Sequence, residues 1–223
     1  MAPSQLLKQV YETLYESYGP QSWWPADSSF EVMVGAVLTQ NTAWKNVEKA
    51  IAQLKENCGM TPEGILSIPE EKLEEMIRSS GYFRQKAARL RGLCRYLIIN
   101  GGKDFSRLAG LSTSSLREQL LALNGIGPET ADSILLYAFG RPVFVVDAYT
   151  VRLLDRIGIL PGKGKYEEVQ GLFTTSLAPD PALFNEYHGL IVIHGKERCR
   201  KKDPFCAGCP LSDLCLEGGT RIR

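Results

Sequence analysis

Several features are scarce in this chain, and each absence excludes a class of protein. The 223 residues carry a formal net charge of only +1, so a nucleic-acid-binding surface would have to be a local patch. No apolar run is long enough to cross a membrane. The N-terminal segment also lacks the apolar core of a signal peptide. We therefore expect a cytoplasmic protein that does not bind a membrane.

Histidine and strand-like patterns are also scarce. The chain contains two histidines, His188 and His194, and we expect both to be structural and to lie near the C-terminal cysteines. One run, 143–146, has a strand-like composition, and we expect a buried extended segment there. The apolar fraction of 44% is that of a globular protein with a substantial core. Apolar residues elsewhere recur with helical spacing, so the sequence predicts an all-α protein.

Two predicted helices in the middle of the chain are joined by a tight turn. The first covers 113–122. The second begins after Gly127, which can be its N-cap, has Pro128 at its first position and runs to Phe139. Glycine at Gly125 and Gly127 permits positive φ and the close approach of another backbone. The N–H groups of the turn and of the second helix would point at one spot, which suits a phosphate. The alternative is an ordinary turn between two helices, with a C-cap glycine and no role in binding.

A single carboxylate follows this hairpin. The apolar run 143–146 leads directly to Asp147. Together, the hairpin and Asp147 resemble the helix-hairpin-helix DNA glycosylases of the endonuclease III superfamily. In that family the aspartate acts on a nucleotide flipped out of the duplex. The resemblance extends from about Phe30 to Cys215, and it implies phosphate binding by a set of residues in and near the hairpin: Gly125, Gly127, Thr130 and Lys86.

The family resemblance also implies how the chain is divided. We expect two helical lobes with a DNA cleft between them. Residues 29–140 would form a six-helix barrel that contains the hairpin. Residues 1–28 and 141–223 would form the second lobe, which carries the C-terminal cysteines.

Four cysteines near the C-terminus have the spacing C-x6-C-x2-C-x5-C: Cys199, Cys206, Cys209 and Cys215. Thiolates this close in sequence can hold one metal centre. Structural zinc is the alternative, but it commonly uses two C-x2-C pairs, and only one pair here is tight. The gaps match the 4Fe-4S loop of endonuclease III. The resemblance therefore implies a 4Fe-4S cluster in the loop 199–215 that orders a basic segment.

Two further segments match family parts that distort DNA. Gln40 and Asn41 lie where members carry a Gln-containing loop, which fills the hole left by the extruded nucleotide. The sequence leaves open which of the two fills it. Tyr82 stands where a large residue wedges into the opposite strand, although it could instead pack the start of the next helix. The basic helix that follows, including Lys86, would be a phosphate track.

The residues around the expected base pocket favour a methylated purine. Trp23, Trp24, Pro25, Trp44 and Tyr149 resemble the pocket of the 3-methyladenine DNA glycosylase III branch. A cationic base gains more than a neutral one from contact with an indole face. A lid on the core is the alternative role of the two adjacent tryptophans. The complete set of cysteines departs from the best-known members of that branch.

The expected chemistry depends on two carboxylates. Glu129 stands where bifunctional members carry the lysine that forms an imine with the sugar, and a glutamate cannot form a Schiff base. A monofunctional glycosylase is therefore favoured. In it, ionised Asp147 would stabilise the oxocarbenium ion and orient or deprotonate water. Asp147 could also cap the helix that follows it.

We accordingly predict a base-excision repair enzyme that acts on double-stranded DNA containing alkylated purines such as 3-methyladenine. It would be a monomer associated with a bacterial or archaeal nucleoid. One alternative is an endonuclease III-like glycosylase for oxidised pyrimidines or for uracil and thymine mismatches, with or without AP lyase activity. Another is a non-catalytic iron–sulfur DNA-binding module, against which the position of Asp147 argues.

Overall fold

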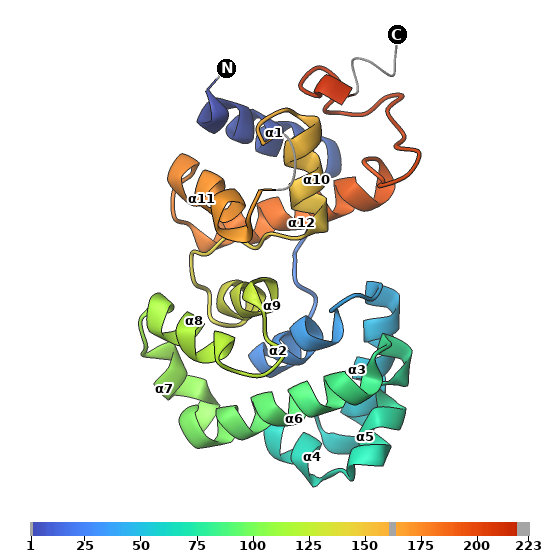
Figure 1. Cartoon of the computed structure of the whole chain (residues 1–223), viewed down its shortest axis with the longest axis vertical. Coiled ribbons are helices and arrows are strands. Elements are labelled where there is room, and N and C mark those ends of the chain that lie inside the picture. Colours follow the sequence, from blue (N-terminus) through green and yellow to red (C-terminus); the bar gives the residue numbers. More distant parts are fainter. Residues whose placement is uncertain (1, 161–163, 218–223) are drawn as a thin grey trace. The chain divides into compact units, whose positions relative to one another are not determined.

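The computed structural model describes residues 2–160 and 164–217, and every regular element in those residues is a helix (Figure 1). The all-α prediction is therefore confirmed. The chain divides into two compact units. We call Ala26–Arg141 the continuous unit, and Met1–Pro25 with Pro142–Arg223 the discontinuous unit. Within the described residues, no helix is long and apolar enough to cross a membrane.

The continuous unit is built around α2, in which every residue after Ser29 is buried. The hydroxyl of Ser28 accepts a hydrogen bond from the Glu31 N–H and caps this helix. Helices α3, α6 and α9 pack against α2. The α-helices of this unit are α2 (Ser29–Leu38), α3 (Trp44–Cys58), α4 (Pro62–Ser67), α5 (Glu70–Met76), α6 (Phe83–Asn100), α7 (Ser106–Ala109), α8 (Thr113–Leu121) and α9 (Pro128–Ser133).

Three short turns complete the continuous unit. They are the 3-10 turns η1 (Arg78–Ser80) and η2 (Lys103–Phe105) and the π-helical turn η3 (Ile134–Ala138). The turn η3 continues α9 without a break and packs against α2. The second helix predicted for the hairpin is thus α9 followed by η3.

The discontinuous unit is built around α12, against which α1 and α10 pack. Its helices are α1 (Pro3–Tyr18), α10 (Ala148–Arg156), α11 (Tyr166–Ser176) and α12 (Pro181–Glu197). An aromatic cluster fills its core. Phe144 stacks on Phe173 with ring centroids 3.7 Å apart, and Phe184 and Tyr187 approach Phe144 edge-on.

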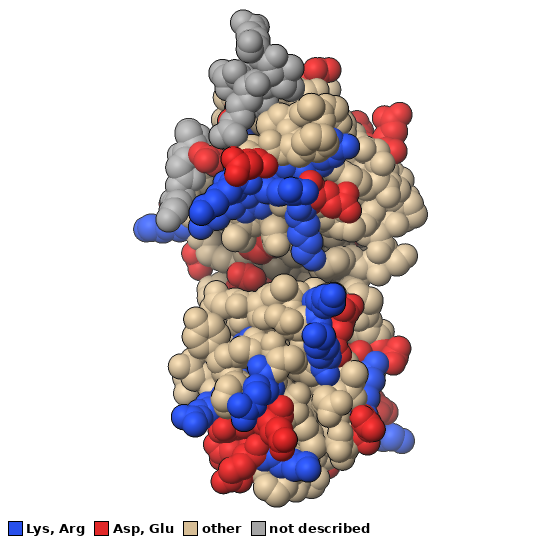
Figure 2. Space-filling view, turned by 90° about the vertical axis from the view of Figure 1, so that its right-hand side faces the viewer, with Lys and Arg blue, Asp and Glu red and all other residues tan. Residues whose placement is uncertain are grey.

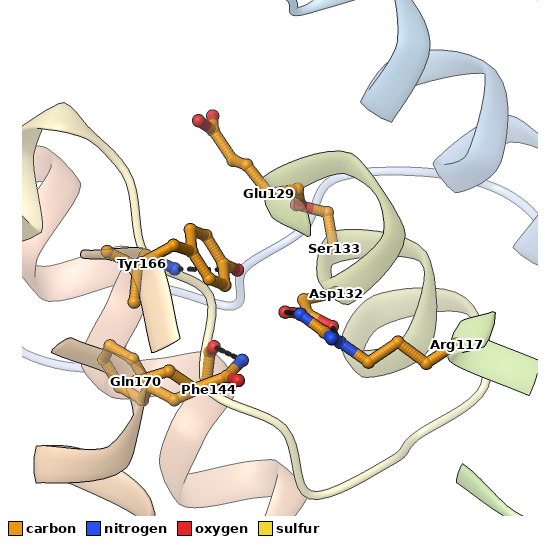
Figure 3. Close-up of polar contacts among 8 residues, drawn as sticks. Arg117, Glu129, Asp132, Ser133, Phe144, Tyr166 and Gln170 are labelled. Carbon is orange, nitrogen blue, oxygen red and sulfur yellow. Dashed lines mark hydrogen bonds and ion pairs between the residues drawn. The ribbon is translucent and has the colours of Figure 1, made fainter. Parts of the chain in front are cut away.

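The run 143–146 is extended and ends in three buried residues, 144–146, as predicted. Side chains of α11 bind its backbone (Figure 3). The side-chain amide of Gln170 donates to the Phe144 carbonyl at 2.7 Å, and the Val146 N–H donates to the Tyr166 hydroxyl at 3.4 Å. A buried segment without a neighbouring strand still needs partners for its polar groups, and α11 supplies them. These contacts fix the approach to Asp147.

Candidate functional site

Asp147 lies where the buried extended segment ends and α10 begins. Its Oδ1 accepts hydrogen bonds from the Thr150 N–H at 2.8 Å and from the Thr150 hydroxyl at 2.9 Å. Asp147 is therefore the N-cap of α10, as predicted. Its side chain keeps 13% of its surface exposed. The carboxylate is thus fixed in orientation and still reaches the surface.

His188, on α12, lies beside the same carboxylate. Its Nε2 is 3.6 Å from Asp147 Oδ2, and its side chain is buried. Burial acts to raise the pKa of Asp147, but His188 and the hydrogen bonds from Thr150 outweigh it and hold that pKa below its usual 3.8. Asp147 is thus ionised at neutral pH. The expected position of His188 beside the cysteines is wrong, and nothing in the local sequence linked it to Asp147.

Two of the predicted pocket aromatics pack on glycines of α12. A Cβ atom added to Gly189 would lie 3.0 Å from the Trp23 Cβ, and one added to Gly195 would lie 2.4 Å from the Tyr149 ring. Trp23 and Tyr149 are both half-buried. Trp23 therefore does pack on the core, and part of each ring remains accessible.

The other predicted pocket residues are distributed over both units. Trp24 is half-buried and meets Trp23 edge-on, with ring centroids 5.9 Å apart, while Pro25 is exposed. Trp44 is the first residue of α3 in the continuous unit and is half-buried. Within the discontinuous unit, the aromatic side chains are therefore those of Trp23, Trp24 and Tyr149.

The hairpin between α8 and α9 has the expected turn. Gly125 has φ +79°, a left-handed conformation that glycine permits. Gly127 has φ −93° and is the N-cap of α9, and Pro128 follows it at the first helical position, as predicted. Gly125 and Gly127 are both exposed. The turn is therefore open to solvent.

An ion pair holds the two hairpin helices together. Arg117 on α8 donates two hydrogen bonds to the buried carboxylate of Asp132 on α9, at 2.7 and 3.0 Å. Figure 3 shows this pair and, on the same helix, Glu129 with its carboxylate directed away from Asp132. Glu129 is exposed in the first turn of α9. Because the pair is bidentate and largely buried, it fixes the orientation of the hairpin.

The structure separates the roles of Gln40 and Asn41. The side-chain N–H groups of Gln40 donate to the Gly125 carbonyl at 3.0 Å and to the Thr130 hydroxyl at 2.9 Å. Its Oε1 accepts from the Arg89 guanidinium. Asn41 is exposed on a left-handed backbone with φ +54°. The Thr130 side chain is buried beneath Gln40, so its hydroxyl is not at the surface that a phosphate would meet.

At the start of α6, the Tyr82 side chain is exposed and the Lys86 side chain is buried. Tyr82 is 64% exposed on a left-handed backbone with φ +46°. Lys86 is fully buried, and its ammonium donates to the Leu38 carbonyl at 2.8 Å and to the Ser80 carbonyl at 2.6 Å. Burial, and then the Arg89 charge, lower the pKa of Lys86 to about 8. The predicted phosphate contact of Lys86 is therefore wrong, because its ammonium lies inside the unit.

The four C-terminal cysteines line one pocket, together with residues of α10 and α12. Arg156 Nη1 lies 3.1 Å from the Cys199 sulfur, and His194 Nε2 lies 3.9 Å from the Cys209 sulfur. Within the described residues, no three potential ligands are grouped closely enough for a single metal ion. The four cysteine side chains therefore line one space, which Arg156 and His194 also line.

The remaining two cysteines lie apart from this pocket, in the continuous unit. Cys94 is buried in α6, and burial raises the pKa of its thiol to about 12. Cys58 is half-buried and donates to the Leu54 carbonyl. A thiol with a raised pKa is a poor nucleophile at neutral pH.

The segment that carries the cysteines is basic. Arg198 lies over the ring of the exposed Phe205, with its guanidinium carbon 4.7 Å from the ring centroid. Arg200, Lys201 and Lys202 are exposed. Figure 2 shows Lys and Arg side chains gathered on the visible face of the discontinuous unit. A local basic patch thus exists despite a net charge of only +1.

Comparisons with known proteins cover both Asp147 and the cysteines. The family model described as "HhH-GPD superfamily base excision DNA repair protein" matches residues 34–179. A candidate DNA repair glycosylase of Methanocaldococcus jannaschii is 45% identical over 213 residues, which make up 95% of this chain and 96% of that protein. The match to the M. jannaschii protein is therefore long enough to include most of the chain outside 34–179.

Two solved structures are similar in fold. A trapped endonuclease III–DNA covalent intermediate superposes with a TM-score of 0.84 at 26% identity, covering 100% of both chains. The H. pylori 3-methyladenine DNA glycosylase bound to 1,N6-ethenoadenine superposes with a TM-score of 0.72 at 30% identity. That match covers 88% of this chain and 98% of the H. pylori chain.

Proposed function

The chain belongs to the HhH-GPD superfamily of base-excision DNA repair proteins, and we propose that it is a monofunctional glycosylase that releases alkylated purines such as 3-methyladenine from double-stranded DNA. DNA glycosylase activity follows from the family. The monofunctional mechanism and the substrate class are the proposed parts. The observation that carries the mechanism is Asp147, whose ionised carboxylate is fixed by Thr150 on one oxygen and faced by His188 on the other.

The proposed reaction is hydrolysis of the bond between C1′ of the deoxyribose and the purine. Flipping brings the nucleotide out of the stack. As the bond breaks, its electron pair leaves with the base, and the Asp147 carboxylate stabilises the positive charge on the sugar. Water then adds to C1′, and its proton passes to Asp147. A purine alkylated at a ring nitrogen, such as 3-methyladenine, already carries a positive charge in DNA, so it departs as a neutral base without a strong general acid.

The aromatic side chains of the discontinuous unit support a cationic purine as the substrate. Trp23, Trp24 and Tyr149 each keep part of their surface accessible, and indole faces attract cations more strongly than neutral bases. The H. pylori protein is named a 3-methyladenine DNA glycosylase, and the similarity to it supports the same substrate class. Pro25, which follows Trp24 in the same unit, is proposed to contact the base as well.

Asn41 and Tyr82 are proposed to occupy the DNA where the nucleotide leaves it. Both are exposed, and both have left-handed backbones. Gln40 is held inward by its hydrogen bonds to Gly125 and Thr130. Asn41 is therefore the better candidate to fill the gap, with Tyr82 as the wedge. The exposed turn at Gly125 and Gly127 would bind the phosphate backbone through its N–H groups.

The absence of a lysine at position 129 supports hydrolysis without strand cleavage. Glu129 offers no amine to attack C1′. The variant Glu129→Lys should gain a product that is trapped on abasic DNA by borohydride, whereas the wild-type chain should give none. Trapping by the wild type would show that another amine replaces the lysine, and the monofunctional assignment would then fail.

The cysteine pocket fits a 4Fe-4S cluster. All four cysteines line one space, which Arg156 of α10 and Arg198 also line, and cationic neighbours offset the charge of four thiolates. Cys199, Cys206, Cys209 and Cys215 would hold the cluster, which would supply a structural tie across the loop 199–215. The purified chain should contain about four iron atoms, and Cys209→Ser should contain almost none. One zinc ion per chain would contradict the cluster.

Base release from defined duplexes tests the substrate class. The duplexes would carry 3-methyladenine, thymine glycol or a uracil–guanine pair, and the products would be analysed with and without hot alkali. We expect release of 3-methyladenine, with strand breaks only after alkali. Release of thymine glycol, or of uracil opposite guanine, without release of 3-methyladenine would favour the endonuclease III-like alternative. Nicking without alkali would contradict the monofunctional mechanism.

A further inference from the structure

Two basic side chains at the start of α6 point into the continuous unit. Lys86 and Arg89 lie three residues apart and so share one face of the helix. The Lys86 ammonium binds the carbonyl of Leu38, the last residue of α2, and the carbonyl of Ser80 in η1. Asn41 follows shortly after Leu38, and Tyr82 follows shortly after Ser80. One buried ammonium therefore holds the backbone shortly before Asn41 and shortly before Tyr82.

Arg89 connects one of these segments to the hairpin. Its guanidinium donates to Gln40 Oε1, and the Gln40 amide donates to the Gly125 carbonyl and the Thr130 hydroxyl. Arg89 also covers the hairpin turn directly, because a Cβ atom added to Gly125 would lie 2.2 Å from Arg89 Nε. Gly125 is thus required twice, by its positive φ and by the close approach of Arg89.

We propose that Lys86 and the Gln40–Arg89 pair are positioning residues that join the Asn41 segment, the Tyr82 turn and the hairpin turn into one rigid device for opening the duplex. The inference rests on the proposed function, since it assigns Asn41 and Tyr82 to the DNA. Both residues have backbone conformations that cost energy in non-glycine residues. A surrounding network that holds them before DNA arrives lowers the ordering cost of binding. Phosphate binding by the hairpin and insertion of the two side chains would then occur together.

A competing role for Arg89 is a simple phosphate contact. The two roles predict different responses to Arg89→Lys. Lysine keeps the charge but cannot reproduce the planar, multiple-donor geometry of arginine, so a phosphate contact would largely survive and the contact with Gln40 would not. Arg95→Lys is a matched control, because Arg95 is exposed on the same helix.

The first experiment measures strand opening without any base release. The duplex carries an abasic-site analogue opposite 2-aminopurine, whose fluorescence rises when it unstacks. We expect Gln40→Ala and Arg89→Lys each to lower the ratio of affinity for this duplex to affinity for an undamaged duplex about tenfold below the wild-type ratio. Each variant should also reduce the fluorescence rise. The double variant should lose no more affinity than the single variant with the larger loss. Additive losses, or wild-type behaviour of Arg89→Lys, would overturn the proposal.

The second experiment uses the free protein. The N–H of Ile126, in the hairpin turn, donates to the Leu123 carbonyl, and its hydrogen exchange reports how firmly the turn is held. Exchange there should be about tenfold faster in Gln40→Ala and unchanged in Arg95→Lys. Faster exchange with normal strand opening would reduce the network to a structural role and overturn the proposal. If both experiments succeed but no base is released from any duplex, the proposed function fails while the rigid device stands.

Discussion

The two units differ in whether the side chains proposed to act on DNA are held by hydrogen bonds. In the discontinuous unit the reactive group itself is held, because Asp147 is hydrogen-bonded by Thr150 and faced by His188. In the continuous unit the exposed side chains of Asn41 and Tyr82 make no hydrogen bond to any described residue. The side chains held by hydrogen bonds there are those of Gln40 and Lys86.

This difference matches two different tasks. A carboxylate that stabilises a transition state must be aligned before the substrate arrives, because reorganisation during the reaction would cost rate. Side chains that enter a DNA stack receive their partners from the DNA, so only their backbone has to be placed beforehand. Lys86 and Gln40 are inward-facing residues that serve this placement.

The largest effect should come from removing the negative charge of the held carboxylate. Asp147→Asn keeps a side chain that can cap α10, so the fold should be retained. We expect single-turnover release of 3-methyladenine to fall about 1,000-fold, while affinity for a duplex with an abasic-site analogue stays within about threefold of wild type. A loss of affinity as large as the loss of rate would place Asp147 in binding rather than in catalysis.

Loss of either exposed side chain should have a smaller effect of a different kind. We expect Asn41→Ala and Tyr82→Ala each to slow base release about tenfold, because unstacking then lacks the inserted group. The loss should be smaller on a duplex in which the damaged base faces a mismatch, since such a base is already easier to flip. Equal losses on paired and mispaired duplexes would remove these two residues from strand opening.

Replacing the histidine that faces Asp147 should move a pH profile. His188 helps to lower the pKa of Asp147, so His188→Gln should raise that pKa. The carboxylate would then become protonated at a higher pH, and the acid limb of the rate profile would shift toward neutrality. At neutral pH the rate should fall only a fewfold. An unshifted acid limb, with any change in rate, would show that His188 serves packing alone.

Replacing the buried ammonium of Lys86 should lower the free energy of unfolding, which is measured separately from activity. Lys86→Met leaves the Leu38 and Ser80 carbonyls without their donor, which should cost about 1–3 kcal/mol of unfolding free energy. The pKa of Lys86 is about 8 when folded, against 10.5 when exposed. The unfolded chain therefore binds more protons between these values, so the contribution of Lys86 to stability grows as pH rises from about 8 to 10.5. The destabilisation by Lys86→Met should grow with it in denaturant titrations.

The elements of the fold could be read from the sequence because helix signals are local. Pro128 at the start of α9 and the apolar faces of the helices depend on neighbouring residues, and the structure confirms them. Gly127 at the N-cap of α9 is a local signal of the same kind, because Pro128 follows it at the first helical position.

The candidate site was only partly predictable, because side-chain partners come from distant segments. Asp147 follows the hairpin in a local pattern, whereas His188 reaches it from α12. Lys86 sits in a basic run that has the pattern of a solvent-facing helix surface. Its burial depends on two carbonyls, those of Leu38 and Ser80, that no local pattern identifies. Charge in the sequence thus did not reveal which basic residues face inward.

The most direct test follows strand opening and base release in the same reaction of the Asp147→Asn variant. It asks whether strand opening proceeds without the carboxylate that base release requires. The duplex would carry 3-methyladenine, with 2-aminopurine placed next to its pairing partner to report unstacking. The account predicts that fluorescence rises at the wild-type rate and amplitude while no free 3-methyladenine accumulates. Release of the base at the wild-type rate, or loss of the fluorescence rise together with release, would contradict it.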